Sequence, residues 1–118
     1  MKGNNLGEFE ELVLLLVGIL YEEAYGVAVQ RGLEEHVDRR VKISAVHSTL
    51  SRLEKKGYVV SRMGGATSDR GGRRKRLFTL TEAGRVVLDE RRQERASLWQ
   101  MMPRWAASPI PNLGAFHA

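Results

Sequence analysis

Apolar and polar residues alternate along this chain with the periods expected of four helices and one short hairpin. Between Leu6 and Leu20 the apolar residues recur every three or four positions, which predicts a helix with one buried face. The residues assigned to that face are Leu6, Phe9, Leu12, Val13, Leu16, Ile19 and Leu20. A short connection at 22–25 leads to a second expected helix at about 26–37, where the interior Gly32 costs roughly 1 kcal/mol relative to alanine.

The third predicted helix, about Ser44 to Lys56, has two clearly different sides. The apolar side is expected to face the core and consists of Ile43, Val46, Leu50 and Leu53. The opposite side carries hydrogen-bond donors, most of them short: Ser44, His47, Ser48, Ser51, Arg52 and Lys55. Ser44 is a suitable N-cap and Gly57 a suitable helix end. Short donors allow the helix to approach base edges closely in a DNA major groove, which is ~12 Å wide. The alternative interpretation is that these residues form an ordinary solvated face.

Two short strands are expected next, at 58–63 and 76–80, joined by the glycine-rich segment GGATSDRGGRRK. Glycines permit a tight hairpin, and the bases at its tip have no evident structural partner. These bases, with the first residue of the second strand, are Arg70, Arg73, Arg74, Lys75 and Arg76. The pattern predicts a winged helix-turn-helix, mainly α with a small β-hairpin. Its helix 44–56 would enter the major groove, and its wing, about 64–76, would lie on the phosphate backbone or minor groove.

A last helix is predicted from Glu82 to about residue 102, with Thr81 as its cap. Its segment 89–95 is almost wholly polar, yet apolar residues return beyond it as Leu98, Trp99, Met101, Met102 and Trp105. We expect this end to form a homodimer by packing on the first helix of a second copy, through Leu98, Trp99, Met101 and Met102 against Leu12 and Leu16. The alternative folds it back onto its own first helix.

The expected organisation is therefore a winged helix-turn-helix domain at 1–81, a dimerisation helix at 82–105 and a flexible tail at 106–118.

The positive charge of the chain is concentrated in its middle. Residues 39–76 hold 12 Lys or Arg against two acids, whereas residues 1–38 hold two against eight, and the net charge of all 118 residues is +5. Such a basic block on one helix and one hairpin is typical of a protein that contacts a phosphate backbone. The alternative is a winged-helix module that binds RNA or another protein. RNA-binding proteins usually expose aromatic residues for base stacking, and the basic block has only Tyr58.

Composition and motifs argue against several other classes. The chain has no cysteine, which excludes disulfides, thiolate catalysis and zinc fingers. We find no catalytic string or phosphate-binding loop, and His36, His47 and His117 are scattered, so we expect no enzyme, metal site or cofactor. The longest apolar run, 12–20, is far shorter than the ~20 residues that cross a bilayer, and the first residues lack the order of a signal peptide. We expect a cytoplasmic, nucleoid-associated protein without a membrane partner.

Four strings of the chain resemble the PadR family of transcriptional regulators: LGEFEELVLLLVGIL, EEAYGVAVQRGLEE, ISAVHSTLSRLEKKGYVVSR and DRGGRRKRLFTLTEAGR. The resemblance spans about 6–95 and is specific in order and spacing. It implies a winged helix-turn-helix homodimer that represses promoters at inverted-repeat operators. It also implies the family's short type, with one C-terminal helix and no separate ligand-binding domain.

The resemblance bears on two individual residues. His47 stands where the family usually has a tyrosine whose hydroxyl is commonly assigned a DNA contact; histidine also donates a hydrogen bond but reaches less far. Some PadR-like regulators hold flat aromatic compounds between tryptophans at the dimer centre. Trp99 is therefore a candidate contact for a small aromatic effector. The alternative is that Trp99 packs in the dimer interface, which is the more common role of a tryptophan at such a position.

Overall fold

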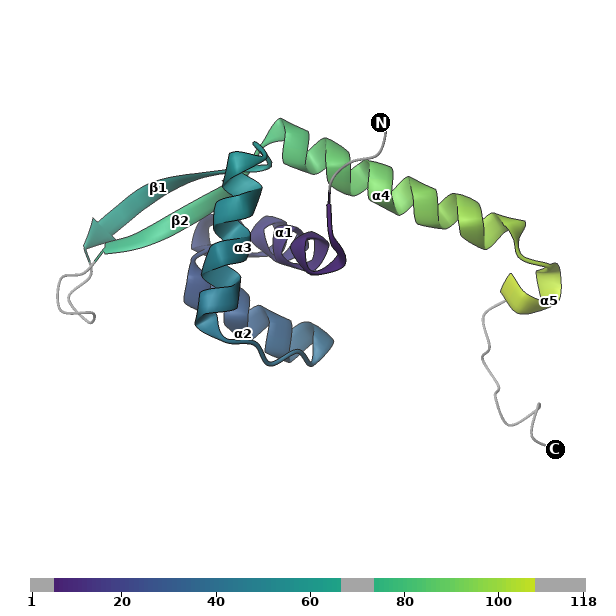
Figure 1. Cartoon of the computed structure of the whole chain (residues 1–118), viewed down its shortest axis with the longest axis horizontal. Coiled ribbons are helices and arrows are strands. Elements are labelled where there is room, and N and C mark those ends of the chain that lie inside the picture. Colours follow the sequence, from purple (N-terminus) through teal and green to yellow (C-terminus); the bar gives the residue numbers. More distant parts are fainter. Residues whose placement is uncertain (1–5, 67–73, 108–118) are drawn as a thin grey trace.

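The computed structural model describes residues 6–66 and 74–107, which form mainly helices with one antiparallel hairpin. The elements are α1 (Glu8–Leu20), the 3-10 turn η1 (Tyr21–Glu23), α2 (Gly26–Val37), α3 (Ile43–Lys55), β1 (Val59–Ala66), β2 (Arg74–Leu80), α4 (Glu82–Met101) and α5 (Arg104–Ala107). The hairpin and α4 leave the body of α1, α2 and α3 in opposite directions (Figure 1). This architecture confirms the fold class predicted from the sequence.

The core lies between the first three helices and the start of the hairpin. Its most deeply buried side chains are Val13, Leu14, Val17, Val29, Leu33, Val46, Thr49, Leu50, Leu53 and Val59. The buried face predicted for α1 is partly wrong, because Leu14 and Val17 are buried whereas Ile19 is 65% exposed. The reason is that Glu10 occupies a buried position of α1, so the buried face is rotated relative to the apolar stripe.

The ends of α3 differ slightly from the prediction. Ser44 is not the N-cap, since α3 begins at Ile43 and Lys42 occupies the cap position. The carbonyl of Lys42 already accepts the first hydrogen bonds of the helix, so the first turn closes two residues earlier than a cap at Ser44 would allow. Gly57 does end the helix as predicted, with a φ of +84° that glycine adopts without strain.

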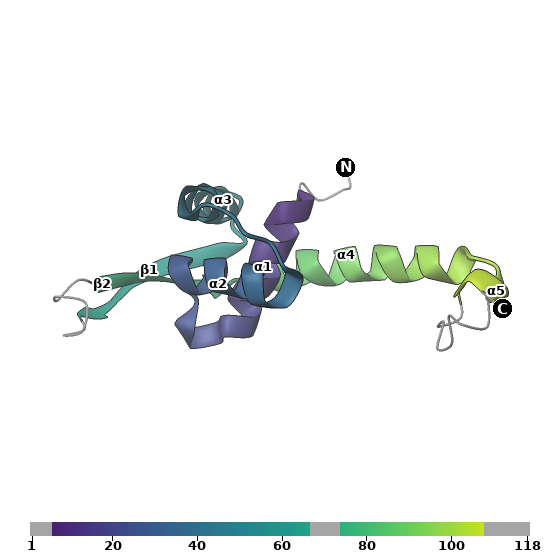
Figure 2. The same ribbon diagram turned by 90° about the horizontal axis from the view of Figure 1, so that it is seen from below.

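The hairpin is longer than predicted and is attached to the start of α2. Its register runs from Val59 opposite Leu80 to Met63 opposite Arg76, with an irregularity before Ala66. The segment before α2 forms a bridge to the middle of β2, where the Phe78 N–H donates to the carbonyl of Ala24 at 2.8 Å. This contact fixes the wing relative to the segment just before α2, and Figure 2 shows the molecule from a second direction, with the hairpin and α4 again on opposite sides of the helical body.

Helix α4 starts against the body and then extends away from it (Figures 1 and 2). The Thr81 Oγ1 accepts a hydrogen bond from the Gly84 N–H at 3.0 Å, which confirms the predicted cap. The far end of the helix does not fold back on α1. Among the described residues, Leu98, Trp99, Met101 and Trp105 are 57–81% exposed, so the alternative in which this end covers its own first helix is wrong.

Candidate nucleic-acid interface

The outward face of α3 is exposed along its whole length. The exposed residues of this face are Ser44, His47, Ser48, Ser51, Arg52 and Lys55, the same side chains that the sequence assigned to it. The apolar side points into the core, because Val46, Leu50 and Leu53 are fully buried. A helix with one side anchored in this way presents its short donors at a fixed distance from the body.

His47 lies against the first turn of α2. A Cβ atom at Gly26 would lie 2.5 Å from His47 Cε1, so the imidazole fits there because residue 26 has no side chain. Beside His47 is a cavity of about 240 Å³, which the first turn of α2 lines on one side and Arg74, Lys75 and Arg76 line on another. The structure thus brings a side chain predicted for the groove-facing helix together with three bases predicted for the wing.

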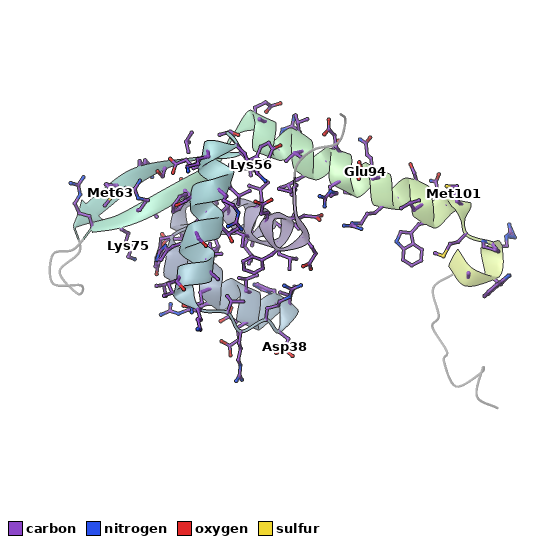
Figure 3. All side chains as sticks on the ribbon, viewed as in Figure 1. Asp38, Lys56, Met63, Lys75, Glu94 and Met101 are labelled. Carbon is purple, nitrogen blue, oxygen red and sulfur yellow. The ribbon has the colours of Figure 1, made fainter. Side chains whose placement is uncertain are left out.

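The three wing bases are held in place by contacts with their surroundings. The Arg74 Nε donates to the carbonyl of Gly64 at 3.0 Å, and the Lys75 Nζ lies 4.1 Å from the centre of the Tyr25 ring. The Arg76 Nη1 donates at 2.8 Å to the hydroxyl of Ser61. Figure 3 shows Lys75 and Met63 along the hairpin. Arg70 and Arg73, which were also predicted as wing contacts, lie outside the described residues.

The wing is also connected to α3 itself. The Ser61 hydroxyl of β1 donates to Glu54 Oε2 at 2.7 Å, and the same hydroxyl accepts the hydrogen bond from Arg76. This chain of two hydrogen bonds joins the C-terminal half of α3 to both strands. The hairpin therefore has a defined orientation relative to the outward face of α3.

A buried carboxylate of α1 binds two bases of α3. The side chain of Glu10 is 8% exposed, and its Oε2 accepts from Arg52 Nε at 3.1 Å. The Lys56 Nζ donates to both oxygens at 2.9 and 3.0 Å, and the Gly7 N–H donates to Oε1 at 2.8 Å. The Arg52 Nη2 also donates to the buried Thr49 hydroxyl at 3.1 Å. We call this set the Glu10 cluster: Glu10, Thr49, Arg52 and Lys56.

The hydrogen bonds of the cluster decide the ionisation of its carboxylate. Burial alone would raise the pKa of Glu10. Hydrogen bonds from Lys56, the Gly7 N–H and Arg52 outweigh burial and hold the pKa below its ordinary value of 4.5. Glu10 is therefore ionised at neutral pH and counters the charge of two bases on α3.

This lowered pKa predicts a defined loss of stability in acid. The contribution of the Glu10 carboxylate is fully present above pH 4.5, its value in the unfolded chain, and is lost as the pH falls through the lower folded-state pKa. We expect the melting temperature of the parent to exceed that of the Glu10→Gln variant at pH 7, and the difference to shrink below pH 4.5. Thermal unfolding followed by circular dichroism measures both. A difference that stays constant from neutral pH into acid would contradict the assignment.

Sequence reasoning missed the Glu10 cluster, although one signal was present. Glu10 follows Leu6 by four positions and precedes Val13 by three, which is the spacing of core positions in a helix. An acidic residue at such a position is rarely buried without a cationic partner. The basic residues in and after α3 were candidate partners, but only the fold shows which of them reach Glu10.

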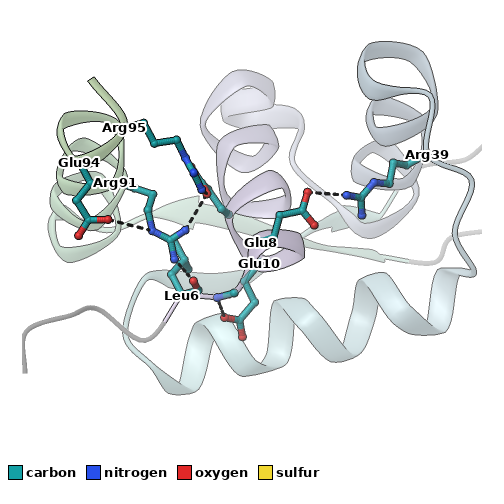
Figure 4. A network of polar contacts seen from close by, with 9 residues as sticks. Leu6, Glu8, Glu10, Arg39, Arg91, Glu94 and Arg95 are labelled. Carbon is teal, nitrogen blue, oxygen red and sulfur yellow. Dashed lines mark hydrogen bonds and ion pairs between the residues drawn. The ribbon is translucent and has the colours of Figure 1, made fainter. Parts of the chain in front are cut away.

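The neighbouring glutamates of α1 bind bases from other segments (Figure 4). The Arg39 Nη2 lies 2.5 Å from Glu8 Oε2, and Glu11 Oε1 accepts from Arg91 Nη1 at 2.9 Å and from Arg95 at 3.5 Å. Arg91 also donates to the carbonyl of Leu6. The first turns of α1 thus connect the α2–α3 loop, α3 and α4.

A larger cavity of about 610 Å³ lies between α1 and α4. Its lining includes Leu15 of α1 and Leu88, Ala96 and Trp99 of α4. Trp99 is 57% exposed and Leu15 is 41% exposed, so apolar surface is available on both helices. The cavity is therefore a concave, partly apolar surface beside the end of α4.

The residues predicted for the dimer contact differ in accessibility. Leu98, Trp99 and Met101 are exposed and Met102 is partly buried. On α1, Leu12 is partly buried and Leu16 is 5% exposed, since Leu16 belongs to the core of its own chain. The exposed apolar residues of α1 are instead Leu15 and Ile19, because its buried face is rotated around Glu10.

Residues 6–66 and 74–107 contain no group of three or more His, Cys, Asp or Glu side chains arranged to hold a metal ion. In the same part of the chain, no helix combines the length and the apolar composition needed to span a membrane.

Comparison with known proteins identifies the family. The model of the transcriptional regulator PadR-like family matches residues 13–90. A solved PadR family transcription regulator from hypervirulent Clostridium difficile R20291 is 27% identical, with a TM-score of 0.62 over 80% of this chain and 97% of that chain. A PadR family transcriptional regulator from Eggerthella lenta DSM 2243 is 26% identical, with a TM-score of 0.61 over 77% and 79% of the two chains.

A third solved structure, the complex structure of hsRosR-S4, is 23% identical with a TM-score of 0.65 over 85% of this chain and 79% of that chain, and shows the fold alone. A search of curated proteins finds no match. The family consists of transcriptional regulators and not of enzymes, which confirms the expectation drawn from the motifs. The family model covers well over half of the chain, so this protein belongs to the PadR-like family of transcriptional regulators.

Proposed function

We propose that this regulator binds double-stranded DNA sequence-specifically, with α3 in the major groove and the wing on the adjacent phosphate backbone or minor groove. The observation that carries the proposal is that His47, on the exposed donor face of α3, lines one cavity together with Arg74, Lys75 and Arg76. A helix of about 10–12 Å diameter fits a major groove ~12 Å wide, so serine side chains can reach base edges. The wing bases are then placed to contact phosphates beside the groove.

The far end of α4 supports the second part of the proposal, a homodimer on an inverted-repeat operator. Three apolar side chains there, Leu98, Trp99 and Met101, are mostly exposed, and α1 offers Leu15 and Ile19 as a second exposed apolar surface. A surface of this kind is typical of an interface between copies. Two copies related by a two-fold axis present two α3 helices in opposite directions, which requires an operator with the same symmetry. Repression of a promoter in the cytoplasm is the outcome we assign to such binding.

We expect the Trp99→Ala substitution to weaken the homodimer. A large aromatic side chain in the centre of an interface typically contributes about 2 kcal/mol, so the dissociation constant should rise roughly thirtyfold. Sedimentation velocity over a range of concentrations measures this change. Trp105→Ala, at an 81% exposed position of α5, is the control and should have a much smaller effect. A Trp99→Ala protein that remains dimeric at the same micromolar concentrations as the parent would refute this interface.

Selection from random duplex DNA tests the function itself. The purified protein should enrich one short sequence with inverted-repeat symmetry, and its affinity should fall steeply as salt rises. Enrichment of single-stranded RNA instead, or binding to no nucleic acid even at low salt, would favour the alternative of an RNA-binding or protein-interaction module. Binding of an aromatic effector beside Trp99 stays a prediction, which the cavity of about 610 Å³ supports by its size and partly apolar lining.

A further inference from the structure

Three bases at the C-terminal end of α3, the helical Arg52 and Lys55 and the C-cap residue Lys56, have very different surroundings. Lys55 is exposed on the outward face, and none of the hydrogen bonds or ion pairs in the described part of the chain involves it. Lys56, the next residue, donates to both oxygens of Glu10, and its side chain is 28% exposed. Arg52 is 52% exposed, but its Nε is bound to Glu10 and its Nη2 to Thr49. Figure 3 shows Lys56 at the end of α3, next to the start of α4.

The burial of Glu10 makes these two bonds difficult to exchange for bonds to DNA. If Lys56 or Arg52 turned toward a phosphate, the carboxylate would lose a cationic partner while remaining 8% exposed. Removing the partner of a buried charge is costly, because the low-dielectric interior does not replace the lost interaction. A phosphate contact offers a smaller gain, because the counterions that one base releases are worth only about fivefold in affinity near 0.15 M salt.

We infer that Glu10 is a positioning residue, which withholds Arg52 and Lys56 from the DNA phosphates and so limits the affinity of the protein for duplex DNA of any sequence. This inference rests on the proposed function. Binding to random sequence depends almost entirely on bases that neutralise phosphates, whereas binding to an operator also uses contacts with base edges. Because phosphate contacts carry no sequence information, withholding two bases lowers the affinity for operator and random duplexes by about the same factor. The outward residues of α3 other than Arg52 keep their access to the groove.

Two adjacent lysines provide the decisive experiment. The affinity of the parent, Lys55→Gln and Lys56→Gln proteins for a mixed-sequence duplex is measured by fluorescence anisotropy at salt concentrations between about 50 and 200 mM. We expect Lys55→Gln to reduce the slope of log affinity against log salt by about one, with about fivefold weaker binding near 0.15 M salt. Lys56→Gln should keep the slope of the parent, because its charge is already bound to Glu10.

Neutralising the carboxylate gives the converse test. Glu10→Gln should release both bases, steepen the slope by one to two and tighten random-duplex binding about fivefold for each base that reaches a phosphate. The affinity for an operator should rise by the same factor, because the released bases contact phosphates and not base edges. The triple variant Glu10→Gln, Arg52→Gln, Lys56→Gln should return to the slope of the parent. Glu8→Gln changes the net charge equally on the same helix but releases only Arg39 of the α2–α3 loop, and serves as the control.

The outcomes separate this inference from the proposed function. Failure of the parent to bind any duplex would refute the proposed function and the inference together. Salt-dependent binding by the parent, with equal slope changes for Lys55→Gln and Lys56→Gln, would overturn the inference alone. An unchanged slope for a Glu10→Gln protein with native circular dichroism would also overturn it. The comparison of Lys55→Gln with Lys56→Gln leaves Glu10 unchanged, so it does not depend on the stability of the Glu10→Gln protein.

Discussion

Replacing Arg74, Lys75 and Arg76 together by glutamine is expected to weaken binding to duplex DNA of any sequence roughly hundredfold near 0.15 M salt. Each base that neutralises a phosphate contributes about 0.9 to the salt slope, which corresponds to about fivefold in affinity at that salt concentration. Glutamine keeps a side chain of similar polarity that can still donate to the Gly64 carbonyl and the Ser61 hydroxyl. The loss should therefore reflect charge and not a rearranged hairpin.

Anisotropy titrations at several salt concentrations measure the effect, and the slope should decrease by up to about three. Arg31→Gln, on the exposed side of α2, is the matched single-charge control and should change affinity less than any single wing variant. The loss should affect operator and random duplexes alike, because these bases are assigned to phosphates. Parental affinity in the triple variant, or a loss that does not depend on salt, would place the DNA elsewhere.

The Gly84→Ala substitution is expected to destabilise the fold by about 1–3 kcal/mol, although alanine is the better helix former. Gly84 lies in the first turn of α4, where a Cβ atom would stand 2.3 Å from the carbonyl oxygen of Tyr58 and 3.0 Å from Leu80 Cδ1. That carbonyl also accepts the Thr81 N–H at 3.0 Å, so it belongs to the junction of α3, the hairpin and α4 and has little freedom to move. The backbone of one of these elements must shift to make room for a methyl group.

Thermal unfolding should show a decrease in melting temperature on the order of 5–15 °C for this variant. Gly18→Ala in α1 is the matched control, since a Cβ atom there would make an ordinary contact at 3.5 Å with Leu80 Cδ2. It should gain up to about 1 kcal/mol from helix propensity. Equal increases in melting temperature for both variants would show that the junction accommodates the methyl group.

The local pattern of the sequence was sufficient to predict most of the elements. Helix 26–37 and the hairpin followed from periodicity and turn residues, and the Thr81 cap and the Gly57 end followed from local backbone chemistry. The partition of α3 into a buried and an exposed side was also predictable, because its apolar residues recur at an unbroken helical period. The N-cap of α3 was misplaced by two residues, since Lys42 closes the first turn without a side-chain bond.

The Glu10 cluster could not be predicted in the same way. Its members are separated by 42 and 46 positions in the chain, so no local window contains both partners. A buried glutamate also makes the buried face of a helix look polar in the sequence. For this reason Ile19 was wrongly assigned to the core. The apolar end of α4 could be recognised in the sequence because no core remained for it to fill. Only the structure shows that these side chains are exposed.

The length of α4 has a mechanical consequence for a pair of chains joined at its far end. With 20 residues and a rise of about 1.5 Å per residue, the helix is a lever about 30 Å long. A pivot of about ten degrees where Trp99 lies would swing the opposite end by about 5 Å, which exceeds the 3.4 Å between successive base pairs. In the homodimer that we propose, the distance between the two operator half-sites is therefore set largely by how the two ends that carry Trp99 pack.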